Sequence, residues 1–139
     1  MNPQGNALVP WIWAAGAVHL AIVAANFALP RRLRVQENAA RLSPLLRQVL
    51  YVHWLYIVIV LLLFASLSFL FAADLAGGSP LGRFLSAAIA LFWLLRIALQ
   101  LFYYDREARR QSRLLDLLYL GALIFLSAVF GAAALGAGQ

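Results

Sequence analysis

The chain has 139 residues, of which 65% are apolar and 12% charged, with a net charge of +6 and a mean hydropathy of +0.86. Soluble domains carry about 45–50% apolar and about 25% charged residues, so this composition excludes an ordinary water-soluble enzyme and predicts a protein that lies mostly in lipid. Cysteine is absent, which excludes disulfides, thiolate chemistry and cysteine metal sites.

The apolar stretches predict four membrane-spanning helices, because crossing the hydrocarbon takes about 20 apolar residues. We expect spans over about residues 9–29, 46–73, 82–104 and 114–135, joined by loops at 30–45 and 105–113. The expected fold is therefore all-α. It is a single four-span domain, an integral membrane four-helix bundle with up-down topology.

Proline and glycine mark the expected helix ends. Pro30 is expected to end the first span, since proline cannot continue a helix. Ser43 and Pro44 predict an N-cap followed by proline at the first helical position. The run from Gly77 to Pro80 predicts a turn between the second and third spans. Residues 33–42 form either a short amphipathic helix along the membrane interface or a loop.

Arginine placement predicts the orientation. Nine arginines lie in or beside the two expected loops, and only Arg83 lies on the other side. The positive-inside rule then places both loops in the cytoplasm and both termini outside (N-out/C-out), in a bacterial inner membrane. The first six residues carry no charged side chain, which favours a retained first span over a cleaved signal. The loop arginines are expected to contact anionic lipid head groups on the cytoplasmic side. No nucleic-acid partner is expected, because no aromatic residues are interleaved with them.

Polar side chains inside the spans mark the candidate site, because such groups are costly in hydrocarbon. With a rise of about 1.5 Å per residue, three of them lie roughly 13–16 Å from the cytoplasmic boundary and three lie roughly 8–9 Å from it. Their helical spacing predicts one polar seam, open to the cytoplasm, that binds an amphipathic ligand, a lipid head group or a partner subunit. The seam residues are His19, Tyr56 and Arg96, with Asn26, His53 and Gln100 nearer the cytoplasm; Trp93, Tyr103, Asp116 and Tyr119 are expected to support them.

Arg96 is the most costly of these residues, at about 2.5–3.5 kcal/mol or more for a guanidinium in the bilayer. No Asp or Glu lies in any span at its height, and Asp116 stands at the boundary. Four kinds of partner remain open for Arg96: neutral groups such as Tyr56 and Gln100, water reached by snorkelling, a carboxylate of another chain, or a bound anion. Trp93 is placed to contact it by a cation–π interaction.

No catalytic residue and no metal site are expected. Two histidines on two helices can ligate haem iron, but His19 and His53 differ in height by roughly 7 Å. This difference disfavours haem. A small redox or transfer enzyme that uses haem, quinone or a thiol cofactor at the seam is kept as an alternative. A structural subunit of a larger membrane complex is another, as is a homo-oligomer. Small residues at four-residue spacing (Ala17, Ala21 and Ala25) favour close helix contacts within the bundle or between copies.

The four spans, the arginine-rich first loop and Arg96 on the third span resemble the glutathione-using membrane enzymes of eicosanoid metabolism in architecture. Those enzymes carry an Arg, Asn and Glu signature for glutathione on the second helix. In this chain the corresponding stretch, residues 47–56, contains Arg47 but neither Asn nor Glu. The resemblance therefore implies the bundle and not the chemistry.

Overall fold

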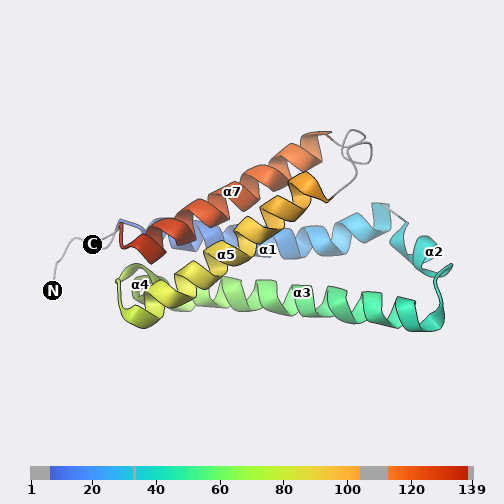
Figure 1. Ribbon diagram of the computed structural model, residues 1–139, viewed down its shortest axis with the longest axis horizontal. Coiled ribbons are helices and arrows are strands. Elements are labelled where there is room, and N and C mark those ends of the chain that lie inside the picture. The colour runs from blue at the N-terminus through green and yellow to red at the C-terminus, as the bar shows by residue number, and fades with distance from the viewer. Residues whose placement is uncertain (1–6, 33, 104–112, 138–139) are drawn as a thin grey trace.

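A computed structural model describes residues 7–32, 34–103 and 113–137, and it confirms an all-α membrane bundle. Four long helices are apolar and long enough to cross a membrane: α1 (Val9–Arg32), α3 (Pro44–Leu70), α5 (Pro80–Phe102) and α7 (Arg113–Leu135). Two short helices, α2 (Val35–Ala39) and α4 (Ala72–Ala76), lie at opposite ends of the bundle (Figure 1). We name these the α2 end and the α4 end. Of the loop expected at 105–113, residues 105–112 lie outside the described residues, and residue 113 begins α7.

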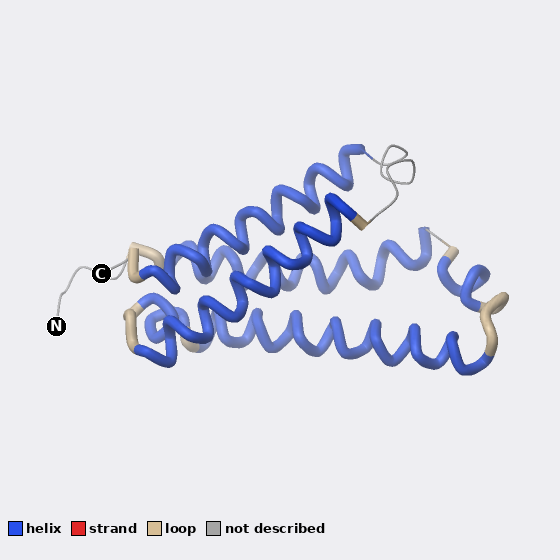
Figure 2. The backbone as a smooth tube through the Cα atoms, in the orientation of Figure 1, coloured by secondary structure: helices blue, strands red, loops and turns tan. Residues whose placement is uncertain are grey.

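The long helices form two hairpins that are joined mainly at the α4 end. Helix α1 packs along α3, and α5 packs along α7. The hairpins meet where α1 touches α7 and at α4, which contacts all four long helices. Toward the α2 end the two hairpins diverge (Figures 1 and 2). The bundle is therefore closed at one end and open at the other.

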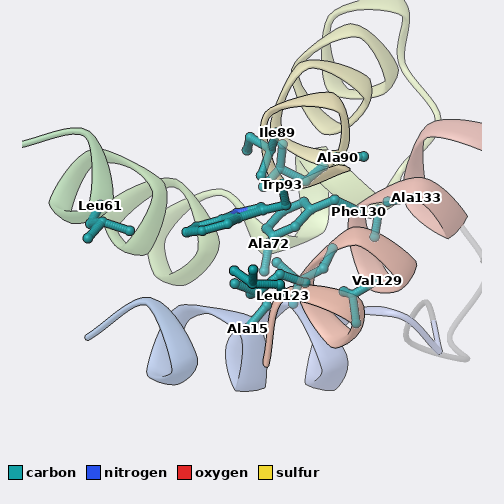
Figure 3. Close-up of a cluster of buried hydrophobic side chains, with 14 of the residues drawn as sticks. Ala15, Leu61, Ala72, Ile89, Ala90, Trp93, Leu123, Val129, Phe130 and Ala133 are labelled. Carbon is teal, nitrogen blue, oxygen red and sulfur yellow. The ribbon is translucent and has the colours of Figure 1, made fainter. Parts of the chain in front are cut away.

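The buried core lies where the hairpins meet. Side chains from α1, α3, α4, α5 and α7 converge on one cluster that includes Trp93 (Figure 3). Phe64 of α3 stacks edge-on against Phe92 and Trp93 of α5, with ring centroids 5.2 and 6.5 Å apart. Because lipid is as apolar as these side chains, close packing rather than escape from water holds the helices together here.

Serine caps and prolines begin two of the spans, which confirms the Ser43–Pro44 prediction. The Ser43 hydroxyl accepts the N–H of Leu46 at 3.4 Å, and α3 begins at Pro44. Ser79 repeats the arrangement: its hydroxyl accepts the Gly82 N–H at 3.0 Å, and α5 begins at Pro80. A serine oxygen satisfies one of the N–H groups that a helix start leaves unpaired.

The second span ends earlier than its composition suggested. Helix α3 stops at Leu70, and Phe71 turns the chain (φ −125°, ψ 26°) into α4. A Cβ at Gly82 would collide with the carbonyl oxygen of Asp74, so only glycine permits this close approach of α5 to α4. The turn from Gly77 to Pro80 is present, with Gly78 at φ 71°. Residues 35–39 of the first loop form α2.

Pro30 does not end α1, which continues to Arg32. Proline has no N–H, so within a helix it leaves the carbonyl four residues earlier without its usual donor. That carbonyl belongs to Asn26, and the indole N–H of Trp54 on α3 donates to it at 3.2 Å. A side chain from the neighbouring helix thus replaces the missing backbone bond and allows the helix to run past the proline.

Candidate functional site

The six residues expected in one seam fall into three separate groups. His19 lies in the core, Arg96 and Gln100 lie between α5 and α7, and Asn26, His53 and Tyr56 belong to the α1–α3 hairpin. The divergence of the hairpins toward the α2 end separates the last two groups. The prediction of a single seam used heights and spacing along each helix, which do not describe how the helices pack against one another.

His19 is fully buried and links α1 to α5. Its Nε2 atom accepts the indole N–H of Trp93 at 3.1 Å, and its ring is surrounded by Phe64, Trp93 and Phe130 at 5.5–5.8 Å between centroids. Because an indole N–H only donates, Nε2 must carry the lone pair, which places the proton of a neutral ring on Nδ1. Nδ1 lies near the backbone of Ala15 and has no well-formed hydrogen bond within the described residues. Ligation of a metal by Nε2 would require the bond to Trp93 to break.

Arg96 reaches a carboxylate of its own chain through Gln100. Its Nη1 donates to Oε1 of Gln100 at 3.0 Å, and Nε2 of Gln100 donates to Oδ1 of Asp116 at 2.6 Å. The guanidinium carbon also lies 5.3 Å from the ring centroid of Tyr119, close enough for a cation–π contact. Gln100, one of the expected partners, therefore bonds directly to Arg96, and Tyr119 of α7 makes the kind of cation–π contact that was expected of Trp93.

Asp116 is well placed to complete this polar chain. It lies in the first turn of α7, where the helix dipole favours a negative charge. Gln100 stands one turn closer to the α2 end than Arg96, so the guanidinium extends in that direction. The cost of an intramembrane charge is thereby reduced without a ligand. Tyr103 lies exposed at the end of α5.

His53 and Tyr56 face away from the core on α3. Tyr56 is 63% exposed, and Nδ1 of His53 lies 2.9 Å from the carbonyl oxygen of Val49 on its own helix. Asn26 is half-buried, and its amide donates to the Ile22 carbonyl at 2.9 Å. Asn26 lines a cavity bounded by α1, α2 and α3, whereas His53 lines a smaller and more open hollow beside Leu46 and Val49.

That cavity is a pocket of about 490 Å³ at the α2 end, bounded by α1, α2 and α3. Phe27, Leu50 and Trp54 supply apolar wall, and Phe27 and Trp54 hold each other in a T-shaped contact at 5.0 Å. Charged side chains stand at its rim: Arg31 from the end of α1, Arg34 from the turn and Glu37 from α2. An apolar interior with a few charged groups at its edge fits an amphipathic ligand.

Sequence reasoning missed this pocket, although part of its signal was present. A proline inside a helix requires another donor for the carbonyl that it frees, and a tryptophan at the matching end of the next span can supply one. The arginines were interpreted only as determinants of orientation and as head-group contacts. Their grouping around a cavity depends on the turn at residue 34, which has no sequence signature.

No group of three or more His, Asp or Glu side chains placed to hold a metal ion occurs in the described ranges 7–32, 34–103 and 113–137. In comparisons with known proteins, no family model, curated protein or solved structure matches the chain.

Proposed function

We propose that this small multi-pass membrane protein is a binding protein that holds an amphipathic ligand in the pocket at the α2 end. The observation that carries the proposal is the combination of a volume of about 490 Å³ with apolar walls and a charged rim. Pockets for small ligands span about 300–1,000 Å³, so the space is sufficient for a lipid-sized group.

The α2 end is proposed to face the cytoplasm of a bacterial inner membrane. Arg31, Arg34 and Arg41 lie at this end, whereas Arg83 lies at the other, near the start of α5. The positive-inside rule favours this orientation. The pocket would then open at the level of the cytoplasmic head groups, where amphipathic molecules present their polar parts.

The polar residues elsewhere in the bundle have partners within the protein, so they are assigned to helix packing rather than to ligand binding. Arg96 and Gln100 are engaged between α5 and α7, and His19 is engaged by Trp93. The bonds from Gln100 to Asp116 and from Trp93 to His19 join helices, whereas the bond from Arg96 to Gln100 lies within α5; none of the three involves a ligand. We therefore assign the ligand contact to Asn26 and the residues around the pocket, and a bundle-holding role to the other two groups.

A blocking variant tests the proposal. Leu50→Trp places an indole at the pocket wall, and Leu63→Trp makes the same change at an exposed position of α3 outside the pocket. Both variants are purified in a mild detergent, checked for helix content and analysed for bound amphiphiles by mass spectrometry. We expect the unmodified chain and Leu63→Trp to retain a bound amphiphile and Leu50→Trp to lose it. Equal retention in all three would refute the proposal.

A second function, that of a subunit in a larger membrane complex, is favoured by the outer face of α3. His53 and Tyr56 carry polar groups on that exposed face, and such groups in a span usually meet a partner. Native mass spectrometry from nanodiscs tests this directly. A chain that is monomeric and free of partners after extraction from its native membrane would exclude it.

A further inference from the structure

The rim of the α2-end pocket carries two guanidinium groups and one carboxylate. Arg31 and Arg34 are both exposed, and both line the pocket together with Glu37. Guanidinium groups present paired donors that match the oxygens of a phosphate group. The excess of positive charge at the rim favours an anionic group over a neutral one.

From this arrangement we infer that the pocket binds the phosphate of an anionic glycerophospholipid, with Arg31 and Arg34 as the phosphate ligands. The inference rests on the proposed function, namely that an amphipathic ligand occupies the pocket. It adds the chemical class of that ligand and the side chains that recognise it.

The backbone at Arg34 brings the two guanidinium groups to the same pocket. Arg34 has φ 50° and ψ 39°, a left-handed conformation that non-glycine residues rarely adopt. This turn leads into α2, and Arg31 near the end of α1 and Arg34 just before α2, only three residues apart, both line the pocket. A residue held in such a conformation is often found where the surrounding structure serves a site.

Glu37 holds Arg34 only weakly. The shortest distance between Nη1 of Arg34 and Oε2 of Glu37 is 3.8 Å, and the two side chains are 77% and 69% exposed. Exposed ion pairs of this kind are easily exchanged. A phosphate can therefore replace the carboxylate as the partner of Arg34, and Glu37 acts as a competitor that lowers the affinity.

The apolar wall distinguishes a lipid from free phosphate. Phe27, Leu50 and Trp54 lie directly inside the rim, where a glycerol group and the first carbons of an acyl chain would follow the phosphate. Tryptophan is typical of this level of the membrane, between head groups and hydrocarbon. Inorganic phosphate would meet the two arginines but gain nothing from this wall.

The test is a lipid titration of the full chain in a non-ionic detergent, followed by native mass spectrometry. The probes are phosphatidylglycerol, a diacylglycerol with the same acyl chains, phosphatidylethanolamine and inorganic phosphate. We expect phosphatidylglycerol to bind most tightly. Arg31→Gln and Arg34→Gln should each weaken it about tenfold, the effect of losing one charge-assisted hydrogen bond. Glu37→Gln should tighten it about threefold by removing the competitor.

Arg41→Gln is the matched control, since Arg41 is exposed on the same segment but does not line the pocket. It should change the affinity by less than about twofold, as expected for an exposed charge without a specific partner. An equal effect of all three arginine variants would overturn the inference in favour of a general attraction to charge.

The probes separate the two proposals. Equal binding of diacylglycerol, or tighter binding of phosphatidylethanolamine, would overturn the anionic phosphate assignment, while loss of that binding in Leu50→Trp would still support the proposed function. Tight binding of inorganic phosphate alone would identify a soluble anion site and overturn the lipid assignment. Binding that Leu50→Trp leaves unchanged for every probe would refute both proposals.

Discussion

The hydrogen bond from Trp54 of α3 to the Asn26 carbonyl is expected to compensate for the backbone N–H that Pro30 lacks, and this can be tested. If Trp54 replaces the donor that Pro30 lacks, then its hydrogen bond matters only while the proline is present. We expect Trp54→Phe to lower the free energy of unfolding by about 1 kcal/mol, since interhelical hydrogen bonds in membranes contribute about 0.6 kcal/mol on average and up to about 1.7 kcal/mol. The phenyl ring keeps an aromatic group beside Phe27, so the bond is the main loss.

In the Pro30→Ala background the expected cost of Trp54→Phe is much smaller. Alanine restores a backbone N–H four residues after Asn26, which can then bond to the Asn26 carbonyl within α1. In this background Trp54→Phe should cost only a few tenths of a kcal/mol, so a double-mutant cycle should give a coupling energy of about 0.7 kcal/mol. Unfolding is followed by far-UV circular dichroism during an SDS titration in mixed micelles, because the substitution itself changes tryptophan fluorescence.

Trp13→Phe serves as the control for this cycle. Trp13 is half exposed on α1, far along the chain from Pro30, and its substitution should add independently in either background. An equal cost of Trp54→Phe with proline and with alanine would show that the indole bond does not compensate for the proline, and the argument for the continuation of α1 would fail.

Further substitutions at three contacts examine the packing by the same unfolding assay. Trp93→Phe should destabilise the fold by about 1–3 kcal/mol, because it leaves a buried imidazole nitrogen unpaired, and adding His19→Leu should recover part of the loss; no recovery would contradict the bond between them. Gln100→Leu should cost about 1–3 kcal/mol by separating the guanidinium of α5 from the carboxylate of α7, and a neutral result would mean that these groups find other partners. Gly82→Ala should destabilise by at least about 1 kcal/mol, because the new methyl group meets the backbone of α4. Gly131→Ala, where a Cβ would enter open space, should be neutral or stabilising by up to about 1 kcal/mol, and similar costs at both glycines would refute the assigned close contact.

The candidate site shows how far sequence reasoning reached. The four-residue spacing of Arg96 and Gln100 placed them on one face of the third span, and their hydrogen bond agrees with that expectation. The role of Asp116 was harder to foresee, since a direct contact across roughly 13 Å of helix is unrealistic. A glutamine between the two charges divides that distance into two hydrogen bonds. Such a relay depends on how α7 lies against α5, which spacing along one helix does not describe.

The amino-acid sequence alone determined the class of the protein and the approximate extent of its four spans. Hydrophobic length and composition decide this, because backbone groups in lipid must bond within their own helix, and an apolar run of sufficient length therefore becomes a span. Ser43 and Pro44 likewise specify a helix start through local chemistry.

Only the tertiary structure decided which polar residues meet. Heights along the membrane follow from counting residues, but the direction of each face follows from how the helices pack. Tyr56 has the right height for the seam and yet is exposed, because α3 turns Val58 and Leu61 rather than Tyr56 toward the core. In lipid no hydrophobic force draws apolar helices together. Small residues and single hydrogen bonds therefore decide which of several packings of similar energy the bundle adopts. That choice is a property of the whole bundle, and no stretch of the chain encodes it alone.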